Sequence, residues 1–197
     1  MINKYAKPNY TFWFDTETTG LDAQKNFVFQ IAYIIKKDDE ILIEKTIECR
    51  PDNYDNFVFD DKACKTHGYS NEQIIAMQSE SEGFKEFMSD LKQFDNIKLK
   101  NCGFNVIFDI RFMHAMFARN NMTTDDYYKI FQYYYLDVYW LAKKLKQAKK
   151  LPLDSLALEN ICDYFNIDHS GAHHAMIDTK NTIAIYEKLL KLSNETQ

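Results

Sequence analysis

The segment FWFDTETTG, residues 12–20, holds two carboxylates, Asp15 and Glu17, one residue apart at the end of an apolar run. In an extended backbone, residues i and i+2 point to the same face, so both side chains can reach one point. Two such carboxylates repel each other unless a cation neutralises them, and their hard oxygens suit Mg²⁺ or Mn²⁺. Solvated surface acids are the commoner outcome for such a pair, but here the preceding strand is apolar on both faces. The pair therefore indicates one part of a metal site.

Two further acids stand in distinctive settings. Asp109, in GFNVIFDIRFM, lies at the start of an apolar helical stretch, with Asn105 four residues before it. Asp178, in HHAMIDTKNT, lies on the last predicted helix, behind His173 and His174. Either acid alone would more often be a helix-surface residue or a cap than a metal ligand. Their appearance together with the first pair favours one shared site.

Predicted strands and helices alternate around these residues. Strands are predicted over residues 10–15, 97–102 and 129–137, and an antiparallel hairpin over 27–50 turns at Lys37–Asp39. Helices are predicted over residues 70–77, 79–94, 108–117, 138–150, 155–165 and 174–192. Helix caps are predicted at Ser70 with Gln73, at Ser79 with Glu82, and at Asp137. This order predicts an α/β domain in which helices cover both faces of a mixed five-stranded sheet.

Length and composition indicate one globular domain, residues 1–197. Hydrophobic residues make up 46% of the chain and charged residues 27%, which excludes a disordered protein. We expect no signal peptide and no membrane partner, because no apolar run approaches the ~18–20 residues that a membrane span needs. The four cysteines are scattered without a CxxC pair, which predicts reduced, mostly buried thiols in a cytoplasmic protein.

Charge and aromatic patterning narrow the classes of nucleic-acid partner. The net charge of −5 argues against a protein that coats long duplexes through phosphate charge alone. An enzyme that holds a few nucleotides through bound metal ions is compatible with it. The five lysines of residues 142–150 are read as a solvated helix end, with contact to a nucleic-acid backbone as the alternative. The rings of residues 127–140 are read mainly as core and strand, with base stacking as the alternative.

Three segments, taken in order, resemble the motifs of a known enzyme family. FDTETTGLD, GFNVIFDIRFM and HHAMID resemble the three exonuclease motifs of the DEDD family of 3′→5′ exonucleases. The spacing His-x-Ala-x-x-Asp resembles the histidine branch of that family (DEDDh), which includes the proofreading ε subunit of bacterial DNA polymerase III, ribonuclease T and oligoribonuclease. THGYSNEQI and DSLALENICDYFNID resemble two further family segments, so the resemblance covers nearly the whole chain.

The resemblance implies a ribonuclease-H-like fold and metal-dependent release of nucleoside monophosphates from a 3′ end. It implies that two Mg²⁺ or Mn²⁺ ions are bound by Asp15, Glu17, Asp109 and Asp178, and that His173 is the general base. The residues that it implies as substrate contacts are Thr16, Thr18, Leu21, His67, Asn105 and Phe108. Leu21 would be the wedge against the terminal base, and His67 and Phe108 would line the pocket of the last nucleotide.

The choice of His173 over His174 depends on where the last helix begins. On a continuous helix, a residue four positions before Asp178 is ~40° away from it and one five positions before is ~140° away, so helical geometry favours His174. The family pattern favours His173. Both arguments hold if the helix begins at about Ala175, because the two histidines then lie in the preceding loop, which Gly171 makes plausible.

The predicted function is hydrolysis at the 3′ ends of single-stranded or frayed nucleic acid, with DNA favoured. One alternative is an RNA-directed exoribonuclease of the same family, since no local feature decides the sugar. Another is a catalytically silent nucleic-acid-binding module of a polymerase or repair complex, against which the retention of all four acids argues. Proofreading would need a polymerase or replication partner, because 197 residues leave no room for a polymerase region.

Overall fold

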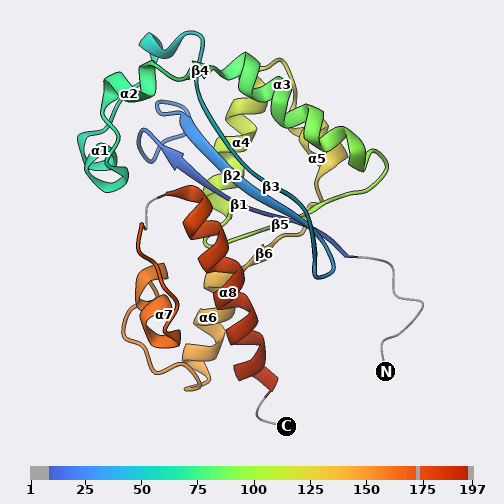
Figure 1. Cartoon of the computed structure of the whole chain (residues 1–197), viewed down its shortest axis with the longest axis vertical. Coiled ribbons are helices and arrows are strands. Elements are labelled where there is room, and N and C mark those ends of the chain that lie inside the picture. Colours follow the sequence, from blue (N-terminus) through green and yellow to red (C-terminus); the bar gives the residue numbers. More distant parts are fainter. Residues whose placement is uncertain (1–8, 172–173, 195–197) are drawn as a thin grey trace.

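The fold is built on a mixed β-sheet. The computed structural model describes residues 9–171 and 174–194, and in this part of the chain the sheet has six strands in the order β4-β3-β2-β1-β5-β6 (Figure 1). The strands are β1 (Tyr10–Thr18), β2 (Val28–Lys37), β3 (Glu40–Arg50), β4 (Gln78–Ser79), β5 (Lys100–Gly103) and β6 (Leu136–Asp137). Antiparallel pairing joins β1, β2 and β3, and parallel pairing adds β5 and β6 on one side and β4 on the other. The predicted mixed sheet is confirmed, and its strand number is corrected from five to six.

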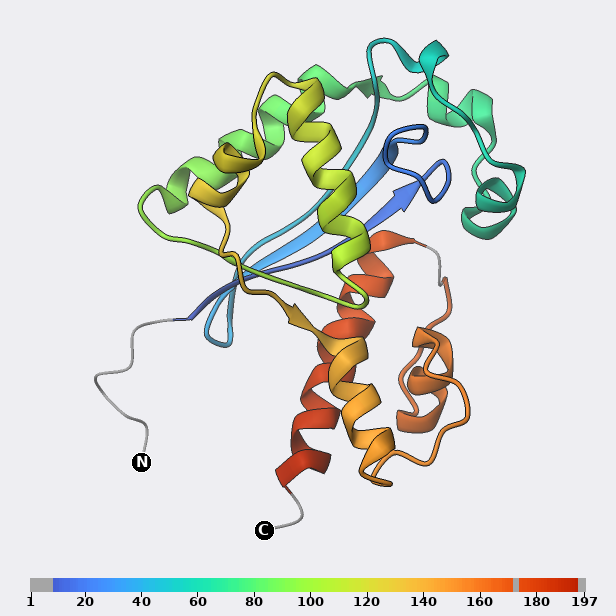
Figure 2. The same cartoon turned by 180° about the vertical axis from the view of Figure 1, so that it is seen from behind.

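Two layers of helices cover the sheet. The helices are α1 (Asp61–His67), α2 (Asn71–Ile75), α3 (Glu80–Leu91), α4 (Ile107–Arg119), α5 (Thr124–Ile130), α6 (Val138–Gln147), α7 (Leu158–Phe165) and α8 (Ala175–Asn194), with short 3₁₀ turns at Tyr54–Asn56 and Lys92–Phe94. Apolar residues of α3, α4 and α5 pack in one core, and those of α6, α7 and α8 pack in the other (Figures 1 and 2). The prediction that helices cover both faces is confirmed.

The alternation of side chains along β1 assigns each residue to one of these layers. Phe12 and Phe14 point into the core with α3 and α4, whereas Trp13 points into the core with α8. Continuing the same period, Asp15 and Glu17 face the α8 side, and Thr16 faces the α4 side. The strand therefore presents acids to one helical layer and a hydroxyl to the other.

The predicted helix caps are confirmed. Ser70 forms a capping box with Gln73 at the start of α2, and the Ser79 side chain accepts a hydrogen bond from the Glu82 amide at the start of α3. Asp137 caps α6 by accepting from the Tyr139 amide.

The strand predicted over residues 129–137 is wrong for most of its length. Residues 124–130 form α5, and only the pair of β6 and an isolated bridge between Leu99 and Phe131 join the sheet. The physical reason is the capping box of Thr123, which starts a helix. Tyr127 and Phe131 then lie four residues apart with ring centroids at 4.5 Å, and residues 132–135 after them are in neither a helix nor a strand.

The cysteine and membrane expectations can be compared with the described residues. Cys49, Cys102 and Cys162 are buried, Cys64 is half-buried, and all four are free thiols. Within the described part of the chain, no helix combines the length and the apolar character needed to cross a membrane.

Candidate functional site

Three of the four predicted acids meet at one point. Asp15 and Glu17 on β1 and Asp178 in the first turn of α8 each offer a carboxylate oxygen, and these oxygens lie within 4.8 Å of one another. The extended strand turns its two acids toward α8, and α8 begins early enough to place Asp178 against them. This is the geometry expected for carboxylates that share a cation.

The fourth acid, Asp109, adjoins this cluster from the other helical layer. It lies in the first turn of α4, is only 3% exposed, and accepts hydrogen bonds at Oδ1 from the Thr16 amide (3.0 Å) and the Thr16 hydroxyl (2.7 Å). Thr16 lies between the two acids of β1, so the bond ties Asp109 directly to the strand that carries them. Asp109 is thus next to the cluster, although its oxygens are not among those that converge.

The carboxyl groups of the site are held in an environment that disfavours their negative charge. Burial, followed by the charges of Asp109, Glu17 and Asp178, raises the pKa of Asp15 well above its usual range. Burial, then Asp178 and Asp109, raises the pKa of Glu17 to about 8. Burial raises the pKa of Asp109 to about 7 against the opposing effect of its Thr16 hydrogen bonds. A cation would relieve this repulsion, so the donor set fits a hard divalent ion such as Mg²⁺ or Mn²⁺.

The start of α8 is held by a buried glutamine that the sequence analysis did not single out. The Gln30 side chain on β2 accepts from the Ala175 amide (2.9 Å) and donates to Glu48 Oε1 (2.7 Å) and to the Tyr69 hydroxyl (3.1 Å). The Tyr69 hydroxyl in turn donates to Glu48 (3.1 Å). Gln30 is fully buried and is paired with Glu17 across the sheet, so it connects the strand acids to the helix that carries Asp178.

The loop before α8 has the boundary that the sequence predicted. The helix begins at Ala175, and the His174 carbonyl accepts from the amides of Ile177 (2.8 Å) and Asp178 (3.2 Å). His174 therefore precedes the helix. His173 lies outside the described residues, and its assignment as the general base stays a prediction.

A small cavity opens beside the acids. It has a volume of about 290 Å³. Its lining includes five of the six predicted substrate contacts, namely Thr16, Thr18, Leu21, His67 and Phe108, together with Glu17. Leu21 is 80% exposed at its edge, as a side chain that meets a ligand would be. His67 is buried and packs edge-on against Phe29.

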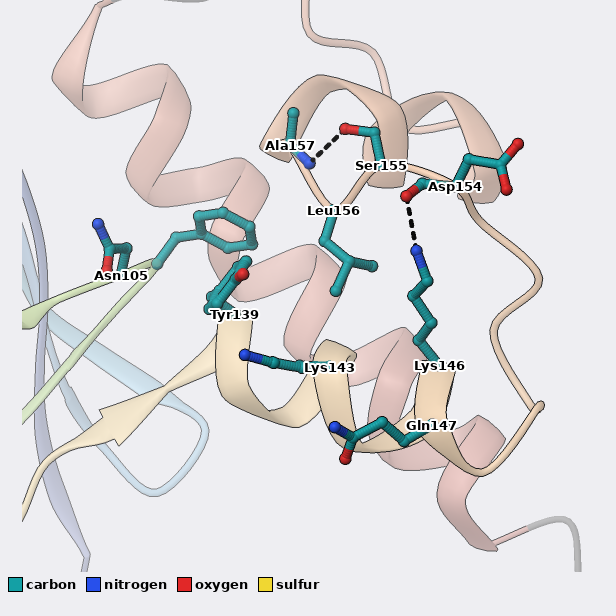
Figure 3. Close-up of a pocket in the computed structure, with 10 residues that line it drawn as sticks. Asn105, Tyr139, Lys143, Lys146, Gln147, Asp154, Ser155, Leu156 and Ala157 are labelled. Atoms are coloured by element: carbon teal, nitrogen blue, oxygen red, sulfur yellow. Dashed lines mark hydrogen bonds between the residues drawn. The ribbon is translucent and has the colours of Figure 1, made fainter.

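Asn105 is the predicted contact that this cavity does not include. Its backbone is in the left-handed region (φ 56°), and its amide donates to Asp137 Oδ1 (2.9 Å). Asn105 lines a second, larger cavity between α6 and the segment before α7 (Figure 3). The four-residue spacing between Asn105 and Asp109 did not predict that Asn105 lines a different cavity. The left-handed turn at Asn105 changes the direction of the chain, so helical spacing does not apply there.

Comparison with known proteins identifies the family. The profile of the RNase T exonuclease family matches residues 12–186, which is most of the chain. The chain belongs to this exonuclease family. The match spans all three motifs that carried the resemblance to DEDD 3′→5′ exonucleases, and it confirms that resemblance.

The individual proteins that resemble this chain are only 22–27% identical to it. A PolC-type DNA polymerase III from Latilactobacillus sakei is 27% identical over 191 residues, covering 92% of this chain and 11% of the polymerase. Escherichia coli exonuclease I in complex with a dT13 oligonucleotide has a TM-score of 0.77 at 22% identity, covering 93% of this chain and 41% of that one. Exonuclease I from Methylocaldum szegediense has a TM-score of 0.75 at 23% identity, covering 96% and 41%. These structures share the predicted fold, and the chain spans less than half of each relative.

Proposed function

We propose that this protein is a metal-dependent 3′→5′ exonuclease, a single domain over residues 1–197 that acts on single-stranded or frayed ends and releases nucleoside monophosphates. The observation that carries the proposal is the convergence of Asp15, Glu17 and Asp178 beside a cavity lined by the expected substrate contacts. Family membership supports the reaction class. DNA is favoured over RNA because the exonuclease I structures similar to this chain include complexes with DNA oligonucleotides.

The acids of the site would hold the metal ions. Asp15, Glu17 and Asp178 offer converging oxygens, and Asp109 adds its charge from the base of α4. Two bound Mg²⁺ or Mn²⁺ ions would supply activation of water and stabilisation of the attacking and leaving oxygens of the phosphodiester. Without a cation the cluster would repel an anionic substrate, which is why the proposal includes metal dependence.

The remaining residues would bind the strand end and move a proton. Leu21 and Phe108, which both line the cavity, would hold the terminal base, and the volume of about 290 Å³ suits one nucleotide rather than a duplex. Thr16, Thr18 and His67 would line the sugar and phosphate. His173 would accept the proton of the attacking water, a task that suits an imidazole with a pKa near neutrality.

A polymerase or replication complex is the proposed partner. The similarity to a segment of a PolC-type polymerase supports this, because there a comparable segment is part of a much longer chain. Co-purification of this protein with the replicative polymerase would support the partner, and separate elution of the two at micromolar concentrations would count against it.

The function is tested by product analysis on matched DNA and RNA oligonucleotides labelled at the 5′ end. With Mg²⁺ we expect a ladder that shortens from the 3′ end, faster on DNA, and no reaction in EDTA. Faster shortening of RNA would establish the exoribonuclease alternative. Tight binding without hydrolysis in either metal would establish the silent module and overturn the proposal.

A further inference from the structure

A groove separate from the acidic cluster lies between α6 and the segment before α7. Its volume is about 1020 Å³. The lining residues are Phe104, Asn105, Tyr139, Lys143, Lys146, Gln147 and residues 154–157. Figure 3 shows Lys143 and Lys146 on the α6 wall, with the Lys146 amine directed across the groove at Asp154 and the Lys143 amine directed along the wall toward Tyr139. The groove is several times larger than the cavity beside the acids.

The groove carries positive charge on a protein whose net charge is −5. Lys146 Nζ donates to the Asp154 backbone carbonyl (2.6 Å), which fixes this ammonium group at the rim. Lys143 Nζ lies 4.4 Å from the centre of the Trp140 ring, a distance typical of a cation–π contact. The one carboxylate on the opposite wall, that of Asp154, points away from Leu156 and Tyr139 (Figure 3). The ammonium groups of Lys143 and Lys146 are therefore both positioned to contact a ligand in the groove.

Aromatic faces accompany the charges. Phe104 and Tyr139 are in edge-to-face contact with ring centroids at 5.8 Å, and both line the groove. Grooves that combine phosphate-binding cations with aromatic rings are typical of proteins that hold single-stranded nucleic acid, because the rings stack on bases whatever their sequence.

The groove is joined rigidly to the acidic cluster. Asp137 accepts hydrogen bonds at one oxygen from the Asn105 amide (2.9 Å) and the Tyr139 amide (3.0 Å), so it ties the loop before α4 to the first turn of α6. Asn105 lines the groove and precedes Asp109 by four residues, and Asp109 lies in the first turn of α4. The loop that lines the groove thus leads directly into the helix that carries Asp109, so a strand with its 3′ end at the acids can extend toward the groove.

We propose that this groove binds the single-stranded segment that lies 5′ to the terminal nucleotide, with Lys143 and Lys146 contacting its phosphates. The inference rests on the proposed exonuclease function and extends it to substrate length. A trinucleotide would place its terminal nucleotide in the cavity beside the acids and extend only two nucleotides beyond it, whereas a longer strand would also occupy the groove. Longer strands should therefore bind more tightly, and the gain should depend on salt.

The test compares a trinucleotide with a dodecanucleotide of single-stranded DNA, first as fluorescent ligands with Ca²⁺ in place of Mg²⁺, so that the acids are neutralised by a hard cation, and then as substrates in Mg²⁺. For the Lys143→Ala/Lys146→Ala double variant we expect about tenfold weaker binding of the dodecanucleotide and a salt dependence reduced by ~0.7 per lost phosphate contact. Binding of the trinucleotide and its kcat should stay unchanged. Lys144→Ala is the matched control, because it removes an exposed lysine of the same helix that does not line the groove.

Two further arms keep structural effects apart from loss of charge. Lys143→Glu reverses one charge and leaves the hydrogen bond between Lys146 and Asp154 in place, and it should weaken dodecanucleotide binding more than Lys143→Ala does. Equal effects of the double variant and Lys144→Ala, or equal weakening for both lengths of DNA, would overturn the groove assignment. If the wild-type protein binds both lengths of DNA as expected but hydrolyses neither, the groove assignment would stand and the proposed function would be overturned.

Discussion

Asp15 is the acid whose pKa is affected by all three other acids of the site. Burial raises its pKa most, and the charges of Asp109, Glu17 and Asp178 raise it further. The sequence predicted one site for the four acids, and the structure brings three of them together and places the fourth against Thr16, which lies between the first two. What the sequence could not predict is that Asp109 contacts Thr16, because that contact depends on the packing of α4 against β1.

Replacing Asp15 by asparagine should abolish hydrolysis and leave the fold intact. The change removes one charge from the centre of the cluster, so metal binding should fail as a whole, and relief of repulsion should raise the Tm of the metal-free protein. Single-turnover assays in Mg²⁺ and thermal denaturation in EDTA measure the two effects. Asp39→Asn, in the exposed turn between β2 and β3, is the control for loss of a charge. Turnover like that of the wild type would refute the metal-site assignment.

Of the two adjacent histidines, His173 should contribute more to kcat than His174. His173→Ala should lower kcat by a factor on the order of 10²–10⁴, which is the usual contribution of a positioned base. His174→Ala should cost far less, because His174 precedes α8 and contributes its backbone carbonyl to the first turn. Metal binding, followed by calorimetry, should survive in both variants. A reversed order of the two effects would mean that the motif is shifted by one residue.

The raised carboxyl pKa values predict how the stability of the metal-free protein depends on pH. Glu17 has a pKa of about 8 and Asp109 of about 7 in the folded state, above the ~4 of the unfolded chain. The folded protein thus holds protons that the unfolded chain has released, so stability is fully present below pH ~4 and is lost as pH rises toward 8. Thermal scans in EDTA should show a lower Tm at pH 8 than at pH 5.5, and each kcal/mol lost shifts the Tm by ~2–4 °C.

Mg²⁺ provides the matched control for this pH effect. The ion should raise the Tm more at pH 8 than at pH 5.5, because it binds the ionised carboxylates. In the Asp15→Asn variant both the pH dependence and the Mg²⁺ effect should shrink. A Tm of the metal-free wild type that rises between pH 5.5 and 8 would contradict the electrostatic account of the site.

At the scale of elements, the site depends on how β2 holds the start of α8. Gln30 reaches a residue 145 positions away in sequence, so no local pattern could have revealed its role. By contrast, the caps at Ser70 and Asp137 were predictable, because a cap acts within its own first turn. The same contrast explains the error over residues 129–137. The cap at Thr123 was visible in the sequence, but the aromatic run after it fits a strand or a helix equally well until packing decides.

Gln30→Ala should lower both activity and stability. It removes the buried acceptor of the Ala175 amide and a donor to half-buried Glu48, so we expect a loss of ~1–3 kcal/mol in the free energy of unfolding. Because Asp178 lies in the turn that Gln30 holds, kcat should fall and the Mg²⁺ concentration needed for half-maximal activity should rise. Denaturant titrations and Mg²⁺ titrations of activity measure these effects.

Tyr69→Phe is the matched control for this network. It removes one hydroxyl from the same set of hydrogen bonds without touching the Ala175 amide. It should lower stability but leave the Mg²⁺ requirement near that of the wild type. If Gln30→Ala also leaves the Mg²⁺ requirement unchanged, Gln30 supports the fold and does not position the site.

At the scale of the whole molecule, charge and shape together restrict the substrate. A net charge of −5 gives little attraction for a distant duplex, so binding should depend on the cavity beside the acids and on the groove along α6. The sequence predicted the fold class and the family over nearly the whole chain. It could not predict the groove, because its walls join α6 and the segment before α7 to Phe104 and Asn105, which lie much earlier in the chain and meet them only in the folded protein.

The central claim is that the protein needs a free 3′ end, and the most direct test compares a linear single strand with its covalently closed circle. Both DNAs carry the same sequence and an internal label, and both are incubated with the wild type and with Asp15→Asn in Mg²⁺. We predict that the wild type releases labelled mononucleotides from the linear strand, leaves the circle intact, and degrades the circle once it is cut at a single site. Rapid cleavage of the intact circle by the wild type would contradict the account, because a circle has no end to enter the cavity.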